Sequence, residues 1–150
     1  MLAGVSPRPR PTLATRLAWS FGGLAALTVV ALSVWLRPDP RGHGTHEQLG
    51  LAPCAFEAVT HIPCPGCGLT TSFSNMAHGH LGAAFGAHLM GPFLFALTLF
   101  VALFAPYALW RAYPVGALLS HRAAGALLSV TLAAGLVTFA LRLAHHTAMR

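Results

Sequence analysis

The chain has 150 residues, of which 55% are hydrophobic and only 8% are charged. An average soluble domain has roughly a quarter of its residues charged, so this chain has too few charges to cover a water-facing surface. A disordered chain is excluded as well, because disorder needs low hydrophobicity and high charge. The composition therefore indicates a small membrane protein.

The charges are unbalanced. Nine arginines and no lysine face three acids, which gives a net charge of +6 with histidine neutral. The arginines are scattered singly, and most of them flank apolar stretches. Nucleic-acid binding would need a basic stripe on a folded surface, so we expect no nucleic-acid partner. Arginines at the ends of membrane helices mark the cytoplasmic side and contact anionic headgroups.

The first predicted elements are a tail and a span. Residues 1–16 are basic, rich in proline and without an apolar period, which predicts a disordered tail. Residues 17–36 carry no charge and would form a helix about 30 Å long, the thickness of the hydrocarbon core. Trp19 and Trp35 lie near its ends, as interfacial rings do. The apolar run exceeds the roughly 7–15 residues of a signal-peptide core, so we favour an uncleaved anchor over a cleaved signal peptide.

A long connection, residues 37–68, follows the first span. Its first part is rich in proline, glycine and histidine and predicts a loop. Residues 69–90 have apolar side chains close to helical spacing. They predict a short amphipathic helix over about Thr70–His78, a break at Gly79 and a further helix that leads into the next span.

Two more apolar stretches, residues 91–110 and 123–143, are separated by a short loop at 111–122. Pro92 is expected to kink the helix it enters, and Pro106 to bend or end it. The sequence thus predicts an all-α membrane protein with three transmembrane helices, a cysteine-containing loop and a short amphipathic, interfacial helix before the second span.

Arginine counts predict the orientation. Five arginines fall on the side of the N-terminus and four on the other side. Three of the five precede the first span, and the first helix usually dominates topology. We therefore expect a cytoplasmic N-terminus, with the cysteine loop and the C-terminus outside the cytoplasm.

All three cysteines, Cys54, Cys64 and Cys67, lie in that one loop. The segment Cys64-Pro65-Gly66-Cys67-Gly68 has the form of a zinc knuckle. Proline fixes one backbone angle, and glycine allows the turn that points two thiolates at one metal. A tetrahedral zinc needs four ligands. With Cys54 as the third, the fourth would come from His61, His78, His80 or a second copy of the chain.

Metal binding is one of three interpretations of the cysteine cluster that the sequence allows. In an oxidising compartment a disulfide among the cysteines competes with a metal. A Cys-x-x-Cys pair at the start of a helix also gains thiolate character and redox activity, although no βαβ domain surrounds this one. Attachment of a c-type haem is excluded, because no histidine follows Cys67.

The candidate site residues are the three cysteines with a neighbouring histidine, and the turn around them. As structural, redox or metal-ligating groups they are Cys54, Cys64, Cys67 and His61; the turn consists of Pro63, Pro65, Gly66, Gly68 and Thr70. The remaining histidines are expected at the surface or the membrane interface, because no His-x-x-x-His pair shares a helical face. The chain has no Glu-x-x-His, Gly-x-Ser-x-Gly or phosphate-loop motif, and we expect it not to be an enzyme. No acid lies within the apolar spans, which argues against a transporter.

These residues resemble a family known as domain of unknown function 2752. The resemblance rests on Cys54-Ala55-Phe56, on Thr60 through Thr70, on Gly79 and on the Gly91-Pro92 pair, and it covers about residues 53–110. Members are small bacterial membrane proteins with a Cys-Pro-x-Cys-Gly-x-Thr-Arg signature, a glycine about ten residues on, and an Asn-Pro that opens the next helix.

Two positions depart from that pattern: Thr71 stands where the family has arginine, and Gly91 where it has asparagine. The resemblance implies a multi-pass protein of the bacterial cytoplasmic (inner) membrane with a cysteine-bearing reentrant or interfacial element. It implies no activity.

The favoured interpretation is a structural or interaction protein whose cysteine turn pins the interfacial helix. Its partners would be the lipid bilayer, a second copy or another membrane protein. The alternative is a membrane thiol–disulfide or metal-handling protein that uses Cys64, Cys67 and Cys54, with zinc as the candidate ion. A second alternative is an accessory subunit of a larger membrane complex.

Overall fold

The structure is a computed structural model that describes residues 12–60, 64–118 and 121–148. Within these ranges every regular element is a helix, as the sequence predicts. Most of the predicted N-terminal tail, residues 1–11, lies outside the described residues.

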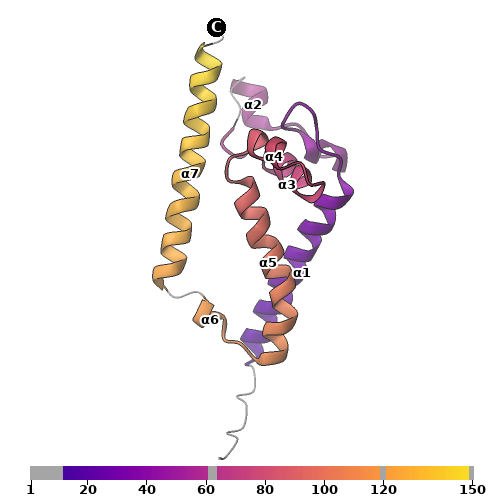
Figure 1. Cartoon of the computed structure of the whole chain (residues 1–150), viewed down its shortest axis with the longest axis vertical. Coiled ribbons are helices and arrows are strands. Elements are labelled where there is room, and N and C mark those ends of the chain that lie inside the picture. Colours follow the sequence, from indigo (N-terminus) through magenta and orange to yellow (C-terminus); the bar gives the residue numbers. More distant parts are fainter. Residues whose placement is uncertain (1–11, 61–63, 119–120, 149–150) are drawn as a thin grey trace, which may run out of the picture.

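Two long helices, α1 (Leu13–Trp35) and α5 (Gly91–Arg111), run side by side in opposite directions (Figure 1). At ~1.5 Å per residue they are about 35 and 32 Å long. Both are long and apolar enough to cross a bilayer, and only 17% of the apolar window of each is buried. A core helix of a soluble protein is buried on most of its surface, so these two helices indicate membrane association.

The two helices approach closely near their middle. A Cβ atom added to Gly23 would lie only 2.6 Å from the Cβ of Ala105. Further along, the Trp19 ring meets the edge of Phe104 at a centroid distance of 5.6 Å, and its Nε1–H donates to the Tyr113 carbonyl at 2.9 Å. Small residues in the middle and an indole hydrogen bond at one end therefore hold the pair together.

Four short helices form a lobe at the other end of this pair, which we call the cysteine lobe (residues 37–60 and 64–90; Figure 1). They are the 3₁₀ helix η1 (Thr45–Leu49), α2 (Ala55–Thr60), α3 (Leu69–Ala77) and α4 (Leu81–Ala87). The connection at 37–68 is therefore not a plain loop, since it contains η1 and α2. The break expected at Gly79 is present, with a φ of 79°.

The expected kink at Pro92 was wrong, and the helix does not end at Pro106. Pro92 lies in the first turn of α5, where a missing N–H costs nothing, so it begins the helix rather than kinking it. The preceding α4 stops at Ala87 and does not run into the span. Pro106 lies inside α5, which continues to Arg111.

Helix α3 buries most of its polar side chains, and α4 exposes its large apolar ones. Within the described residues, every buried side-chain nitrogen or oxygen has a hydrogen-bond partner. Ser72 Oγ donates to the Ala84 carbonyl at 2.7 Å, and Ser74 Oγ donates to the carbonyl of Leu36, which follows α1. Leu81 and Phe85, in contrast, are exposed. This arrangement suits an apolar surrounding better than water.

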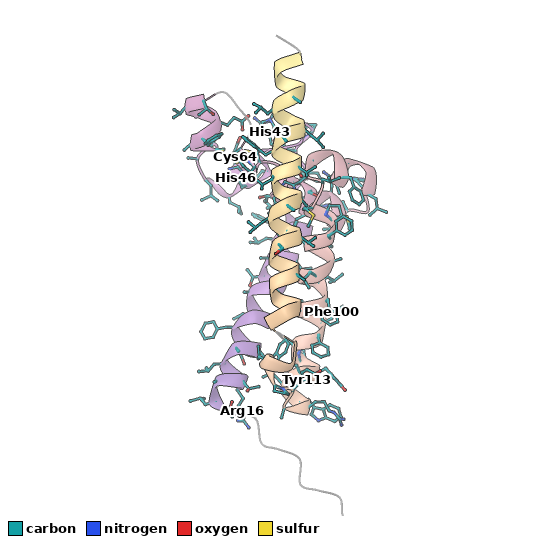
Figure 2. All side chains as sticks on the ribbon, turned by 90° about the vertical axis from the view of Figure 1, so that its left-hand side faces the viewer. Arg16, His43, His46, Cys64, Phe100 and Tyr113 are labelled. Atoms are coloured by element: carbon teal, nitrogen blue, oxygen red, sulfur yellow. The ribbon has the colours of Figure 1, made fainter. Side chains whose placement is uncertain are left out.

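After α5 the chain passes through α6 (Val115–Leu118) into α7 (His121–Ala148), which runs back toward the cysteine lobe (Figure 1). In α7 the apolar stretch among the described residues is Ser129–Leu141. Two helices of the described chain are thus long and apolar enough to span a membrane, and the third span at 123–143 stays a prediction. Figure 2 places Cys64, His43 and His46 near one end of the molecule, and Arg16 and Tyr113 near the other.

Candidate functional site

The cysteine lobe contains an open cavity of ≈ 460 Å³. Residues of three segments line it: the region of η1, the residues around the start of α2, and the turn that precedes α3. All three cysteines are among the lining residues. Residues as far apart in the sequence as Arg41 and Thr71 thus contribute to one site.

The three sulfur atoms converge, with all their Sγ atoms within 4.8 Å of one another. The Sγ atoms of Cys64 and Cys67 are 3.0 Å apart. Cys54 and Cys64 are half-buried, and Cys67 is buried. Three thiols at this spacing need only small movements to bind one soft metal ion, because the sulfurs around a tetrahedral zinc lie about 3.8 Å apart.

Local backbone geometry explains how the turn presents its two thiols. The Cys67 N–H donates to the Cys64 carbonyl at 3.0 Å, which closes a tight turn. Gly68 then takes a φ of 88° as the residue that precedes α3, a conformation that glycine adopts without strain. The Ser72 N–H donates back to the Gly68 carbonyl at 2.8 Å. The turn is therefore continuous with the first turn of α3.

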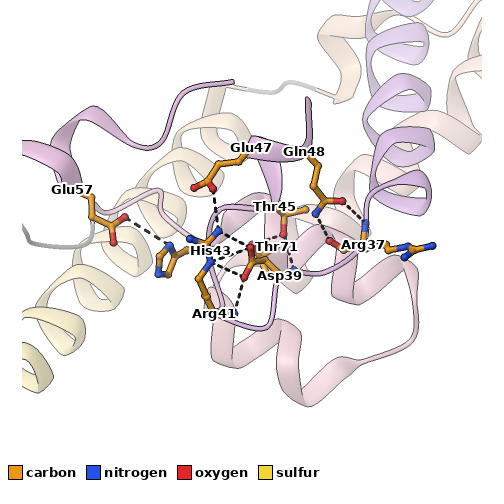
Figure 3. A network of polar contacts seen from close by, with 9 residues as sticks. All are labelled: Arg37, Asp39, Arg41, His43, Thr45, Glu47, Gln48, Glu57 and Thr71. Carbon is orange, nitrogen blue, oxygen red and sulfur yellow. Dashed lines mark hydrogen bonds and ion pairs between the residues drawn. The ribbon is translucent and has the colours of Figure 1, made fainter. Parts of the chain in front are cut away.

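The carboxylate of Glu57 lies beside the three cysteines. Glu57 Oε2 lies 3.6 Å from Cys67 Sγ and accepts its S–H, and it lies 3.9 Å from His43 Nδ1 (Figure 3). Glu57 follows Cys54 by three residues, the same separation as between Cys64 and Cys67. The sequence pattern pointed to histidines as the fourth ligand and not to Glu57, although the Cys-x-x-Glu spacing was a usable signal.

The environments of the cysteines shift their acidity in opposite directions. A backbone N–H of Glu57 that donates to the Cys54 sulfur lowers the pKa of this thiol, and hydrogen bonds from Cys64 and Cys67 lower it further. Burial raises the pKa of the Cys67 thiol well above its ordinary value, and hydrogen bonds with its two neighbours add to that rise. Cys54 is thus the more reactive of these two thiols.

An ionic and hydroxyl network holds the outer wall of the cavity (Figure 3). The Arg41 guanidinium donates to Asp39 at 2.8 Å and to Glu47 at 3.0 Å, and its hydrogen bond lowers the pKa of the Asp39 carboxyl. The Thr45 hydroxyl accepts the Asp39 N–H at 3.1 Å and lies 2.8 Å from the hydroxyl of Thr71 in α3. This network fastens the segment after α1 onto α3.

Four of the five candidate turn residues lie within the described part of the chain. Gly66, Gly68 and Thr70 line the cavity, and the Pro65 carbonyl accepts a hydrogen bond from His88. His61 and Pro63 lie outside the described residues.

Two of the three histidines considered as fourth ligands, His78 and His80, lie away from the cavity that holds the sulfurs. The His78 and His80 rings stack on each other at 6.4 Å, and neither residue is among those that line the cavity. The expectation that the remaining histidines lie at the surface or the membrane interface was wrong for His88, which is buried. Its two ring nitrogens form hydrogen bonds with backbone groups, which makes this burial possible.

Thr71 and Gly91, the two residues that depart from the signature expected from the resemblance, both lie in tightly packed places. Thr71 exposes no surface, so the longer side chain of arginine would have to displace Thr45 from its place in η1. A Cβ atom on Gly91 would overlap the side chain of Ser72. Asparagine therefore does not fit at position 91 while Ser72 occupies that space.

A family model described as "Protein of unknown function (DUF2752)" matches residues 54–102. The match starts at Cys54 and runs through the cysteine turn, α3 and α4 into α5. Searches of the curated proteins and of the solved structures each found no match. The resemblance deduced from the sequence is thus confirmed over this range: residues 54–102, which hold all three cysteines and the first part of the second long helix, match the DUF2752 family model.

Proposed function

We propose that this chain is an integral protein of the bacterial cytoplasmic membrane that holds one zinc-class metal ion at Cys54, Cys64 and Cys67, on the outer side of the bilayer. The ion has a structural role: it joins the start of α2 to the turn before α3 and so pins the α3–α4 pair at the membrane surface. The observation that carries the proposal is the convergence of three thiols, from two segments, within 4.8 Å beside an open cavity.

The distribution of apolar side chains supports the membrane part of this proposal. Large apolar residues are exposed along each long helix, for example Phe21 at 73%, Leu103 at 72% and Leu136 at 68%. In water this surface would drive aggregation, whereas lipid tails solvate it. Exposed Trp35 and Trp110, near the ends of α1 and α5, suit the two interfaces.

We propose three spans, at 17–36, 91–110 and 123–143, with a cytoplasmic N-terminus. The direction of α7, back toward the cysteine lobe (Figure 1), supports a third crossing. With three spans the C-terminus and the cysteine lobe share the outer side. A C-terminal alkaline phosphatase fusion should therefore be active, and a fusion directly after Arg111 should be inactive. The reverse activities would overturn this topology.

Ligand chemistry supports a zinc-class ion. Thiolates bind zinc with Zn–S distances of about 2.3 Å, and soft thiolates select against magnesium and calcium. The Glu57 carboxylate, 3.6 Å from Cys67 Sγ, supplies a fourth ligand after a small rotation. The cavity that would hold the ion is open and is lined by residues of three segments, so a metal can enter it.

Cobalt titration tests this proposal, because thiolate ligands give tetrahedral Co²⁺ a strong charge-transfer absorption. The purified full-length chain in detergent should bind one Co²⁺ with that absorption, and Zn²⁺ should displace it. Cys54→Ser, Cys64→Ser and Cys67→Ser should each weaken the binding strongly. Ala58→Ser, which adds a hydroxyl to the same cavity wall, is the matched control and should bind as the unmodified chain does. Absence of the thiolate band in the unmodified, reduced chain would overturn the metal site.

A second candidate function is favoured by the 3.0 Å contact between the Cys64 and Cys67 sulfurs. The pair would reduce a disulfide of a partner protein. One S–S bond forms between Cys64 and Cys67, the partner's S–S bond breaks, and two protons and two electrons pass to the partner's two thiols. Disulfide exchange with a model disulfide that Cys64→Ser abolishes and Cys54→Ser retains would favour this candidate over the metal site.

A further inference from the structure

His88 is a buried histidine that connects two segments far apart in the sequence. It follows α4 directly and is only 5% exposed. Its Nε2 lies 3.0 Å from the carbonyl oxygen of Pro65, which is 23 residues away. Its Nδ1 lies 3.2 Å from the backbone nitrogen of Met90.

These two contacts assign the tautomer of the ring. The Met90 N–H can only donate, so Nδ1 accepts and carries no proton. The proton of the neutral ring is therefore on Nε2, which donates to the Pro65 carbonyl. The backbone carbonyl of His88 also accepts the Gly91 N–H at 2.9 Å. His88 thus holds the beginning of α5 through its own backbone and the cysteine turn through its side chain.

The group that His88 contacts lies in the middle of the cysteine turn. Pro65 stands between Cys64 and Cys67, and its carbonyl belongs to the peptide that leads to Gly66. A rotation of that peptide would change the directions in which both thiols point. A hydrogen bond from a buried ring, itself fixed by Met90, restricts that rotation.

We propose that His88 is a positioning residue that holds Cys64 and Cys67 in their metal-binding geometry. The inference rests on the proposed metal site and extends it, since it couples that site to the junction of α4 and α5. Residues that orient metal ligands without touching the metal typically contribute 10–100-fold to metal affinity. His88 would act in this way through the backbone between two ligands.

Three substitutions separate this role from a merely structural one. In His88→Gln the side-chain amide keeps a donor that reaches the Pro65 carbonyl. In His88→Asn the amide oxygen still accepts the Met90 N–H, but the side chain is too short to reach the turn. His88→Ala removes both contacts. His80→Ala alters an exposed histidine at the other end of α4 and is the control.

Competition titrations with Zn²⁺ on the full-length chain in detergent provide the main readout. His88→Asn should weaken Zn²⁺ binding by roughly 10–100-fold while its thermal unfolding stays close to that of the unmodified chain. His88→Gln should keep most of the affinity of the unmodified chain, and the control His80→Ala should keep all of it. Equal affinities of the Asn variant and the unmodified chain, or equal losses in the Asn and Gln variants, would overturn the positioning role.

Alkylation of the metal-free chain gives a readout that does not depend on the metal. Cys67 is 8% exposed, and release of the turn should expose it. Its alkylation should be several-fold faster in His88→Asn and His88→Ala than in the unmodified chain, and unchanged in His88→Gln. If the unmodified chain binds no metal, the proposed function fails, and this pattern of rates still supports the positioning of the turn. Equal rates in all variants would refute it.

Discussion

The hydroxyl groups of Thr45 and Thr71 lie 2.8 Å apart, and neither side chain exposes any surface. Thr45 belongs to η1 and Thr71 to α3, 26 residues later. The Thr45 oxygen also accepts the Asp39 N–H. The contact between the two hydroxyls joins η1 to α3.

We expect Thr71→Val to destabilise the chain by roughly 1–3 kcal/mol, because valine keeps the shape and leaves the buried Thr45 hydroxyl with one partner fewer. Unfolding in detergent measures this free energy. Thr28→Val is the control, since Thr28 is exposed on α1 and bonds only its own helix. If Thr71→Val were as stable as the control, the Thr45–Thr71 contact would contribute nothing.

We expect Gly91→Ala to lower stability by about 1–3 kcal/mol, because its Cβ would overlap the side chain of Ser72. Ser72→Gly should restore part of the loss in the double variant. Gly86→Ala should be neutral or stabilising by up to about 1 kcal/mol, because no atom lies within 4 Å of the added Cβ. Equal melting temperatures of the two alanine variants would contradict the packing of α5 against α3.

The α1–α5 contact gives a complementary pair of substitutions. Gly23→Ala should destabilise the chain, because the new Cβ would lie 2.6 Å from that of Ala105, and Ala105→Gly should offset this loss. Gly22→Ala adds a Cβ that meets nothing within 4 Å and is the matched control. A double variant no more stable than Gly23→Ala alone would argue against this crossing point.

The opposite pKa shifts of Cys54 and Cys67 predict an order of alkylation in the metal-free chain. The thiolate is the reactive form, and a lowered pKa gives Cys54 a larger thiolate fraction at neutral pH. Cys67 has a raised pKa, so it should react only when the pH of the solution is well above the pKa of an ordinary thiol. Mass spectrometry of peptides after brief labelling at a series of pH values measures both rates. After denaturation the two rates should become similar; labelling of Cys67 first in the folded chain would contradict the assigned burial.

The two long helices could be located from the sequence because their signal is local. An uncharged apolar run of about 20 residues with aromatic ends indicates a membrane span by itself. The structure has helices at Leu13–Trp35 and Gly91–Arg111, where the sequence predicts spans at 17–36 and 91–110. The clustering of the cysteines was also visible, because all three lie within one short segment.

The rest of the site depends on contacts that no periodicity reveals. Glu57 meets Cys67 across ten residues, and His88 meets Pro65 across 23. The spacing of polar residues in the sequence predicts that α3 has a polar face, but it does not predict whether that face is buried or exposed. That face can be buried because the hydroxyl of Ser74 donates a hydrogen bond to the carbonyl of Leu36, the residue after α1. The two groups meet only in the folded chain.

The proposal that the three cysteines bind one metal ion is tested by a combined metal and thiol count. The count uses the full-length chain, purified under anaerobic conditions in detergent. We expect one zinc-class ion per chain, with Cys54, Cys64 and Cys67 protected from alkylation until a chelator and denaturant are added. The ion and the protection should disappear together in Cys64→Ser. A metal-free chain with three freely reacting thiols, or with one thiol and a Cys64–Cys67 disulfide, would contradict it.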